Sequence, residues 1–125
     1  MSPSLLALIL SGIMLAESGG NPLAIGDDGI SIGAYQINER FHAERAEKWG
    51  EYDPRDPAQA RRIASEIVRS NYEELLPTLR IIDPSQWDDL RVTLAIASYR
   101  QGVAGVRENG PSMWYVNRVL GRSWR

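Results

Sequence analysis

Glu17 is the residue of this chain best placed for acid–base chemistry. It follows an almost uncharged apolar run over residues 5–16 and precedes Ser18-Gly19-Gly20-Asn21-Pro22, which cannot continue a helix. A carboxylate at the end of an apolar helix loses hydration, and this desolvation is expected to raise its pKa. A carboxylic acid that stays protonated near neutral pH can protonate a glycosidic oxygen. On position alone, the more common explanation is a solvated glutamate at a helix end.

Two later segments carry polar side chains that could form a site together with Glu17. The first is Gly33-Ala34-Tyr35-Gln36-Ile37, and the second is Ala97-Ser98-Tyr99-Arg100-Gln101-Gly102 with the residues that follow it to Val106. Gln36 offers an amide donor and an acceptor to the acetamido and hydroxyl groups of a sugar. Each segment is uninformative alone, and the order and spacing of the three carry the signal.

The three segments together resemble the lytic transglycosylase family related to goose-type lysozymes, the soluble lytic transglycosylase domain of the lysozyme-like superfamily. Its members have a Glu-Ser after the first helix, a Gly-Leu-Met-Gln-like segment soon after, and later an Ala-Tyr-Asn-Ala-Gly-like segment. The resemblance spans roughly residues 5–120, nearly the whole chain. It implies an enzyme that cleaves the β-1,4 bond between N-acetylmuramic acid and N-acetylglucosamine in peptidoglycan.

The resemblance also implies roles for individual residues. Glu17 matches the catalytic acid, which protonates the glycosidic oxygen and then, as a carboxylate, accepts the proton of the muramyl 6-hydroxyl. That hydroxyl closes on the anomeric carbon and leaves a 1,6-anhydro end, so neither water nor a second carboxylate is needed. Tyr99 matches the tyrosine that would orient or buffer the carboxyl group. The residues expected to bind substrate are Ser18, Tyr35, Gln36 and Tyr99, although Ser18 also suits a local turn bond and Tyr35 the core.

Arg100 departs from the family pattern, which usually has Asn at this position. An Arg beside Glu17 would lower the pKa of the acid and oppose protonation. We therefore expect Arg100 to point towards substrate or solvent. Ala34 in place of the family's Leu is a milder change.

Two alternatives to a transglycosylase stay open. An inverting muramidase needs a second carboxylate about 6.5–9.5 Å from the acid to activate water. Asp27 and Asp28 lie in the loop where goose-type lysozymes carry such aspartates, although an Asp-Asp-Gly sequence more often forms a turn. A glycan-binding or structural module without activity is the other alternative, and the presence of Glu17 argues against it.

Composition excludes several other classes of function. The chain has 125 residues, a formal net charge of −2, no cysteine and one histidine. It therefore has no disulfide or thiol chemistry, and His42 alone cannot build an ordinary zinc site. No basic stripe suggests nucleic acid. We expect no cofactor, and a monomer whose partner is the glycan strand of peptidoglycan.

The pattern predicts one domain over residues 1–125, mostly α in an α+β lysozyme-like arrangement, with a small β-hairpin or loop after the first helix. Residues 4–16 are too short to span a bilayer, and no Lys or Arg precedes them as in a signal peptide. We expect them to form a buried first helix with Ser2 as its cap. Export is left open: a periplasmic or extracellular protein, a phage-associated protein and a domain cut from a longer exported chain all fit.

Further helices are expected along the rest of the chain. One carries Phe41 and Trp49 and closes at Gly50. Apolar residues three and four apart predict a long amphipathic helix from Pro57 to about Pro77. Another helix follows Asp83-Pro84 and stops at Gly102, a short turn or helix covers 103–109, and a last helix begins after Gly110-Pro111.

Overall fold

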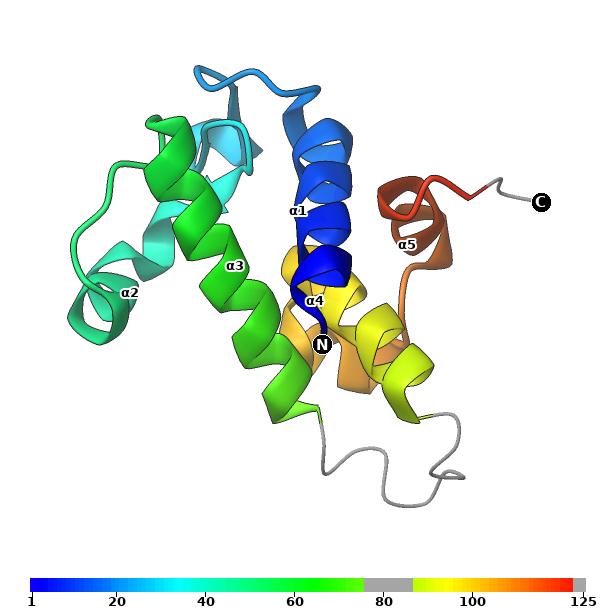
Figure 1. The fold of residues 1–125 in the computed structure, drawn as a ribbon. Helices are drawn as coiled ribbons and strands as arrows, with labels where there is room; N and C mark the ends of the chain where they lie inside the picture. Colours follow the sequence, from blue (N-terminus) through cyan, green and yellow to red (C-terminus); the bar gives the residue numbers. More distant parts are fainter. Residues whose placement is uncertain (76–86, 123–125) are drawn as a thin grey trace. The chain divides into compact units, whose positions relative to one another are not determined.

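The computed structural model describes residues 1–75 and 87–122 (Figure 1). The chain is mostly helical, with a small three-stranded antiparallel sheet after the first helix, as the sequence predicts. In chain order the elements are α1 (Pro3–Ser18), β1 (Ile25–Gly26), the 3₁₀ turn η1 (Asp27–Gly29), β2 (Ser31–Ile32), β3 (Ile37–Asn38), the 3₁₀ turn η2 (Glu39–Phe41), α2 (His42–Trp49), α3 (Pro57–Glu74), α4 (Trp87–Asn109) and α5 (Met113–Val119).

Helix α1 begins and ends where the sequence predicts. The Ser2 hydroxyl accepts a hydrogen bond from the Leu5 N–H at 3.1 Å, which satisfies one of the donors left over in the first turn. At the other end Gly19 and Gly20 have φ of 65° and 91°, values that a side chain disfavours. The helix therefore ends at Ser18, directly after Glu17.

The sheet forms around the Asp-Gly turn that predicted a hairpin. β1 pairs antiparallel with β2, with Ile25 opposite Ile32. β2 pairs in turn with β3, where Ile32 lies opposite Ile37. Ile32 and Ile37 are buried while Ile25 is 63% exposed, so the buried face of this small sheet belongs to its second and third strands.

Two compact units divide the chain. The first unit comprises Met1–Ile9 and Ile67–Arg125, and the second unit is Leu10–Glu66. α1 and α3 each contribute residues to both units. The single domain expected from the sequence stays a prediction.

Each unit contributes buried apolar side chains of its own. In the first unit, Tyr72 of α3 and Leu75 just after it form a cluster with Ala95 of α4. In the second unit the buried apolar side chains come from α1, the sheet with the turn between β2 and β3, the α2–α3 connection and the start of α3, namely Leu10, Ile13, Ile32, Ala34, Tyr35, Ile37, Tyr52, Ala60, Ile63 and Ala64. Of the apolar positions that predicted one buried helix face, Ala60, Ile63, Ala64, Val68 and Tyr72 are buried within α3 and Leu75 is buried just after it.

One helix boundary differs from the prediction. Phe41 lies in η2, before α2 begins at His42, because Asn38 caps that turn by accepting a hydrogen bond from the Arg40 N–H. Within α4, Gly102 has non-helical φ and ψ of 74° and 156° and separates one helical segment from a second that runs to Asn109, so the predicted stop at Gly102 and the short helix after it are confirmed. The expected helix end at Pro77 and start at Asp83-Pro84 lie outside the described residues.

Candidate functional site

Glu17 lies in the last turn of α1 and is half-buried. The glycines that follow it turn the chain away from the helix axis, and the Gly19 N–H still donates to the Leu15 carbonyl at 3.1 Å. Asn21 then begins a second turn by accepting the Leu23 N–H on its side chain. Glu17 is thus placed by a rigid helix immediately before a sharply turned loop, a geometry that favours exact positioning of one carboxyl group.

The Ser18 hydroxyl joins the end of α1 to the second motif. Its oxygen lies 2.6 Å from the Ala34 carbonyl oxygen and 3.3 Å from that of Met14, and it accepts the Gly20 N–H at 3.1 Å. A hydroxyl has one proton to donate, and the shorter contact identifies Ala34 as its main acceptor. The structure thereby brings together the first two motifs, which the sequence separates by a loop and a hairpin.

The Gln36 side chain bonds to backbone just before β1 and just after β2. Its Nε2 donates to the Ala24 carbonyl at 3.2 Å and to the Gly33 carbonyl at 3.0 Å. Its Oε1 lies against Gly26, where an added Cβ would collide with it. Gln36 was expected to bind sugar, and in this conformation its amide is occupied by the protein's own backbone.

Tyr35 is a core residue by its burial, with 2% of its surface exposed. Its hydroxyl accepts a hydrogen bond from Arg61 of α3 at 2.8 Å. The role of Tyr35 in binding sugar stays a prediction, and its burial does not favour that role. Arg61 carries no signal in the sequence, because its partner lies 26 residues earlier and only the fold brings the two together.

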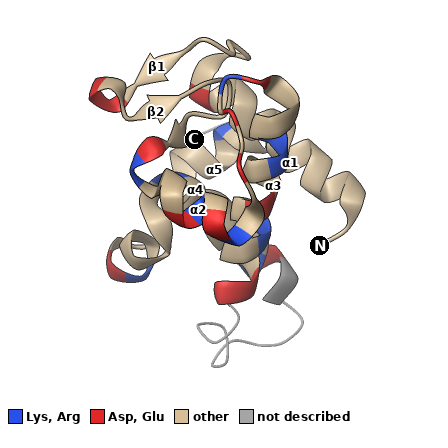
Figure 2. Ribbon diagram, turned by 90° about the vertical axis from the view of Figure 1, so that its left-hand side faces the viewer, with Lys and Arg blue, Asp and Glu red and all other residues tan. Residues whose placement is uncertain are grey.

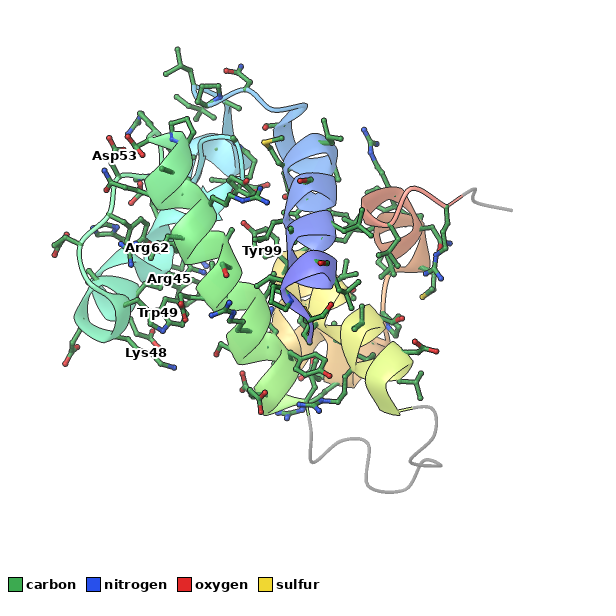
Figure 3. The ribbon with its side chains drawn as sticks, in the orientation of Figure 1. Arg45, Lys48, Trp49, Asp53, Arg62 and Tyr99 are labelled. Atoms are coloured by element: carbon green, nitrogen blue, oxygen red, sulfur yellow. The ribbon has the colours of Figure 1, made fainter. Side chains whose placement is uncertain are left out.

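The third motif lies on α4 in the first unit. Tyr99 is half-buried and labelled in Figure 3. Arg100 is exposed, and its guanidinium lies 5.1 Å from the Trp114 ring centroid and 5.5 Å from that of Tyr115, both on α5. These distances are within the range of cation–π attraction, so the residue that departs from the family pattern contacts two aromatic rings.

A comparison of the whole chain with known families decides its identity. The model of the transglycosylase SLT domain matches residues 2–112. The chain belongs to the transglycosylase SLT domain family. Membership implies lytic transglycosylase activity on the glycan strands of peptidoglycan, in the bacterial cell wall. Neither a curated protein nor a solved structure gives a significant match to this chain.

The two aspartates of this SLT domain that could serve a hydrolase form a tight turn. Asp27 and Asp28 are exposed, with φ of 50° and 57°, and the acidic turn between β1 and β2 is coloured in Figure 2. The Ser31 hydroxyl donates to Asp27 Oδ2 at 2.6 Å, and the Ile30 N–H donates to the Asp27 carbonyl at 3.2 Å. These bonds give Asp27 a role in shaping the turn.

The connection between α2 and α3 packs against Gly33, the first residue of the Gly33–Ile37 segment. Arg62 donates to the carbonyls of Trp49 and Glu51 at 2.7 and 3.0 Å, and Gln59 accepts the Asp53 N–H at 2.8 Å (Figure 3). These bonds hold the segment that carries Pro54. Its carbonyl oxygen faces Gly33 so closely that a Cβ there would collide with it.

Titratable groups around His42, at the start of α2, form a separate cluster in this SLT domain. The His42 ring lies 4.7 Å from that of Tyr52, and its nitrogens lie 3.9 and 3.6 Å from carboxylate oxygens of Glu39 and Glu51. Burial raises the pKa of Tyr52, and the neighbouring Arg45 offsets part of this effect. Among the residues that the structure describes, no group of three or more His, Asp or Glu side chains could hold a metal ion.

None of the helices in residues 1–75 and 87–122 combines the length and the apolar character needed to cross a bilayer.

Proposed function

We propose that this SLT domain cleaves the β-1,4 bond between N-acetylmuramic acid and N-acetylglucosamine with Glu17 as its one catalytic acid and base. The observation that carries the proposal is the place of Glu17 in the last turn of α1, directly before Ser18, whose hydroxyl bonds to Ala34. The Glu-Ser and Gly-Ala-Tyr-Gln segments are therefore neighbours in the folded second unit, as a shared site requires.

The end of a helix is a suitable place for a proton donor. Unpaired carbonyls give the C-terminal end of a helix a partial negative charge, which favours the neutral form of a nearby carboxyl group over the carboxylate. Half-burial of Glu17 acts in the same direction by removing water from the charged form. Both features fit the proton-donor role that the match to the family gives Glu17.

The reaction needs one carboxyl group for both proton transfers. Glu17 donates its proton to the bridging oxygen, the bond from that oxygen to C1 of N-acetylmuramic acid breaks, and the N-acetylglucosamine side leaves with a free hydroxyl. The 6-hydroxyl oxygen of the same muramic acid then bonds to C1, and its proton goes to the Glu17 carboxylate. The enzyme returns to its starting protonation state, and the muramyl end is a 1,6-anhydro sugar.

Tyr99 is the residue of the third motif that we assign to this reaction. Its match to the family's tyrosine supports a role in orienting the carboxyl group or in binding substrate. Its phenol can both donate and accept a hydrogen bond, which suits a carboxyl group that changes protonation state during the cycle.

Substitution of the acid tests the proposal. Glu17→Gln keeps the shape of the side chain and removes its acidity, so we expect release of soluble fragments from purified peptidoglycan to fall at least about 10³-fold. The unfolding temperature should stay close to that of the wild type. A Glu17→Gln variant with wild-type activity would show that Glu17 is not the acid.

Substitution of Asp27 and Asp28 distinguishes the transglycosylase mechanism from that of an inverting hydrolase. In the proposed reaction neither carboxylate takes part, so Asp27→Asn and Asp28→Asn should each keep activity within about threefold. If either variant lost as much activity as Glu17→Gln, the substituted aspartate would instead be the base that activates water.

A further inference from the structure

Both ends of the loop that follows Glu17 are anchored on one turn. Ser18, at the start of the loop, donates to the Ala34 carbonyl at 2.6 Å. Ala24, just past its end, accepts at its carbonyl from the Gly33 N–H at 2.8 Å and from Gln36 Nε2 at 3.2 Å. The turn over residues 33–36, here called the anchoring turn, therefore fixes the path of the chain on the C-terminal side of Glu17.

The side-chain hydrogen-bond donors of Ser18 and Gln36 are all used by these bonds. The one hydroxyl proton of Ser18 and both amide protons of Gln36 have backbone carbonyl acceptors. A sugar could gain these donors only if the anchoring turn first lost them. Donation of a hydrogen bond to substrate by either side chain would thus work against the local structure.

The conformation of Gln36 indicates that its bonds matter. Its φ is 47°, in the left-handed region that disfavours a residue with a Cβ. Such a conformation persists where the surroundings over-determine it, and it occurs preferentially at functional sites. Here the amide bonds to Ala24 and Gly33 supply that support.

We propose that Ser18 and Gln36 are positioning residues, which hold Glu17 through the anchoring turn and make no energetically important contact with the glycan. The inference rests on the proposed function, because it takes Glu17 as the catalytic acid. A carboxyl group displaced by about 1 Å can lose about 100-fold in rate, so loosening the turn should reduce turnover more than affinity.

Kinetics of Ser18→Ala on soluble glycan-strand fragments test the proposal. We expect kcat to fall about 10-fold or more and KM to change by less than about twofold. Ser18→Thr keeps a hydroxyl that can reach Ala34 and should recover most of kcat. Gln36→Met removes both amide donors while keeping the side-chain length, and it should show the same split between kcat and KM.

A control variant separates positioning from general loss of stability. Ser2→Ala removes the hydroxyl that caps the opposite end of the same helix. It loses a comparable hydrogen bond away from the anchoring turn. We expect this control to lower the unfolding temperature and to keep kcat within about twofold.

Binding without turnover gives the decisive readout. In the Glu17→Gln background, adding Ser18→Ala should change the Kd for the glycan fragments by less than about twofold. Weakening of more than about threefold would show that Ser18 contacts substrate and would overturn the inference. Unchanged kcat in Ser18→Ala, or failure of Ser18→Thr to recover it, would overturn it too. An active Glu17→Gln variant would instead reject the proposed function, so the two failures are distinguishable.

Discussion

At the scale of single residues, two glycines allow the anchoring turn to form. Gly33 has φ of 85°, and a Cβ there would collide with the Pro54 carbonyl oxygen. Gly26 lies beneath Gln36, where a Cβ would collide with Oε1 of the amide that holds the turn. At Gly33 the close neighbour is backbone, so only glycine fits there, whereas at Gly26 the end of the Gln36 side chain would have to shift.

Gly33→Ala should be among the more destabilising single substitutions in the second unit. The added methyl group meets a backbone atom and also strains φ, so we expect the free energy of unfolding to fall by about 3 kcal/mol or more. Gly29→Ala is the matched control, since its φ is 89° but no atom lies within 4 Å of its added Cβ.

In Gly29→Ala the methyl group has no neighbour to displace, so backbone strain alone acts. We expect it to lower the free energy of unfolding by about 1–2 kcal/mol. Chemical denaturation of both variants measures the difference. Equal losses in the two variants would contradict the close approach of Gly33 to Pro54.

The sequence predicted some residue roles and missed others for a physical reason. Ser2 as the cap of α1 and the glycine turn after Glu17 depend on neighbours in sequence, and both are confirmed. The bond from Arg61 to Tyr35 and the left-handed backbone of Gln36 depend on contacts formed by folding. Local patterns therefore indicated a candidate site, and tertiary contacts decided what its polar side chains bind.

At the scale of elements, α4 is interrupted within the third motif. Gly102 has φ of 74° and ψ of 156°, a region open almost only to glycine, while the helix continues on both sides of it. The Gln101 side chain bonds across this break to the Gly110 carbonyl at 3.0 Å and accepts the Ser112 N–H at 2.8 Å. The break is thus tied to the start of α5.

Gly102→Ala tests whether this break is required. We expect the free energy of unfolding to fall by about 1–3 kcal/mol, because alanine cannot adopt the backbone angles without strain. Gly105→Ala is the control on the same helix, with φ outside the positive range and its added Cβ at an ordinary 3.5 Å from Gln101.

The control should be neutral or more stable by about 0.5–1 kcal/mol, since alanine favours a helix over glycine. Thermal or urea unfolding of the pair gives the comparison. A Gly102→Ala variant as stable as Gly105→Ala would mean that α4 can run through the motif without a break.

Periodicity explains which elements were predictable. The buried face of α3 follows offsets of three and four residues, and the hairpin follows an Asp-Gly turn, so both are confirmed. β3 has only the two residues Ile37–Asn38, too few for an alternating pattern, and it exists because β2 pairs with it. Short elements that depend on a partner are the ones that the sequence did not indicate.

At the scale of the whole molecule, the family motifs are divided between the two units. Glu17 and the anchoring turn belong to the second unit, and Tyr99 with Arg100 belongs to the first. Because the SLT model matches residues 2–112, the activity implied by the family belongs to a region that includes residues of both units. Neither unit alone contains all three motifs.

The mass of the muropeptides released from purified peptidoglycan tests the central claim most directly. If Glu17 serves as both acid and base, the muramyl ends are 1,6-anhydro sugars, and the products are lighter by one water than those of a hydrolase digesting the same material. Products with ordinary reducing ends, formed by the wild-type protein and absent with Glu17→Gln, would contradict the account and assign hydrolysis instead.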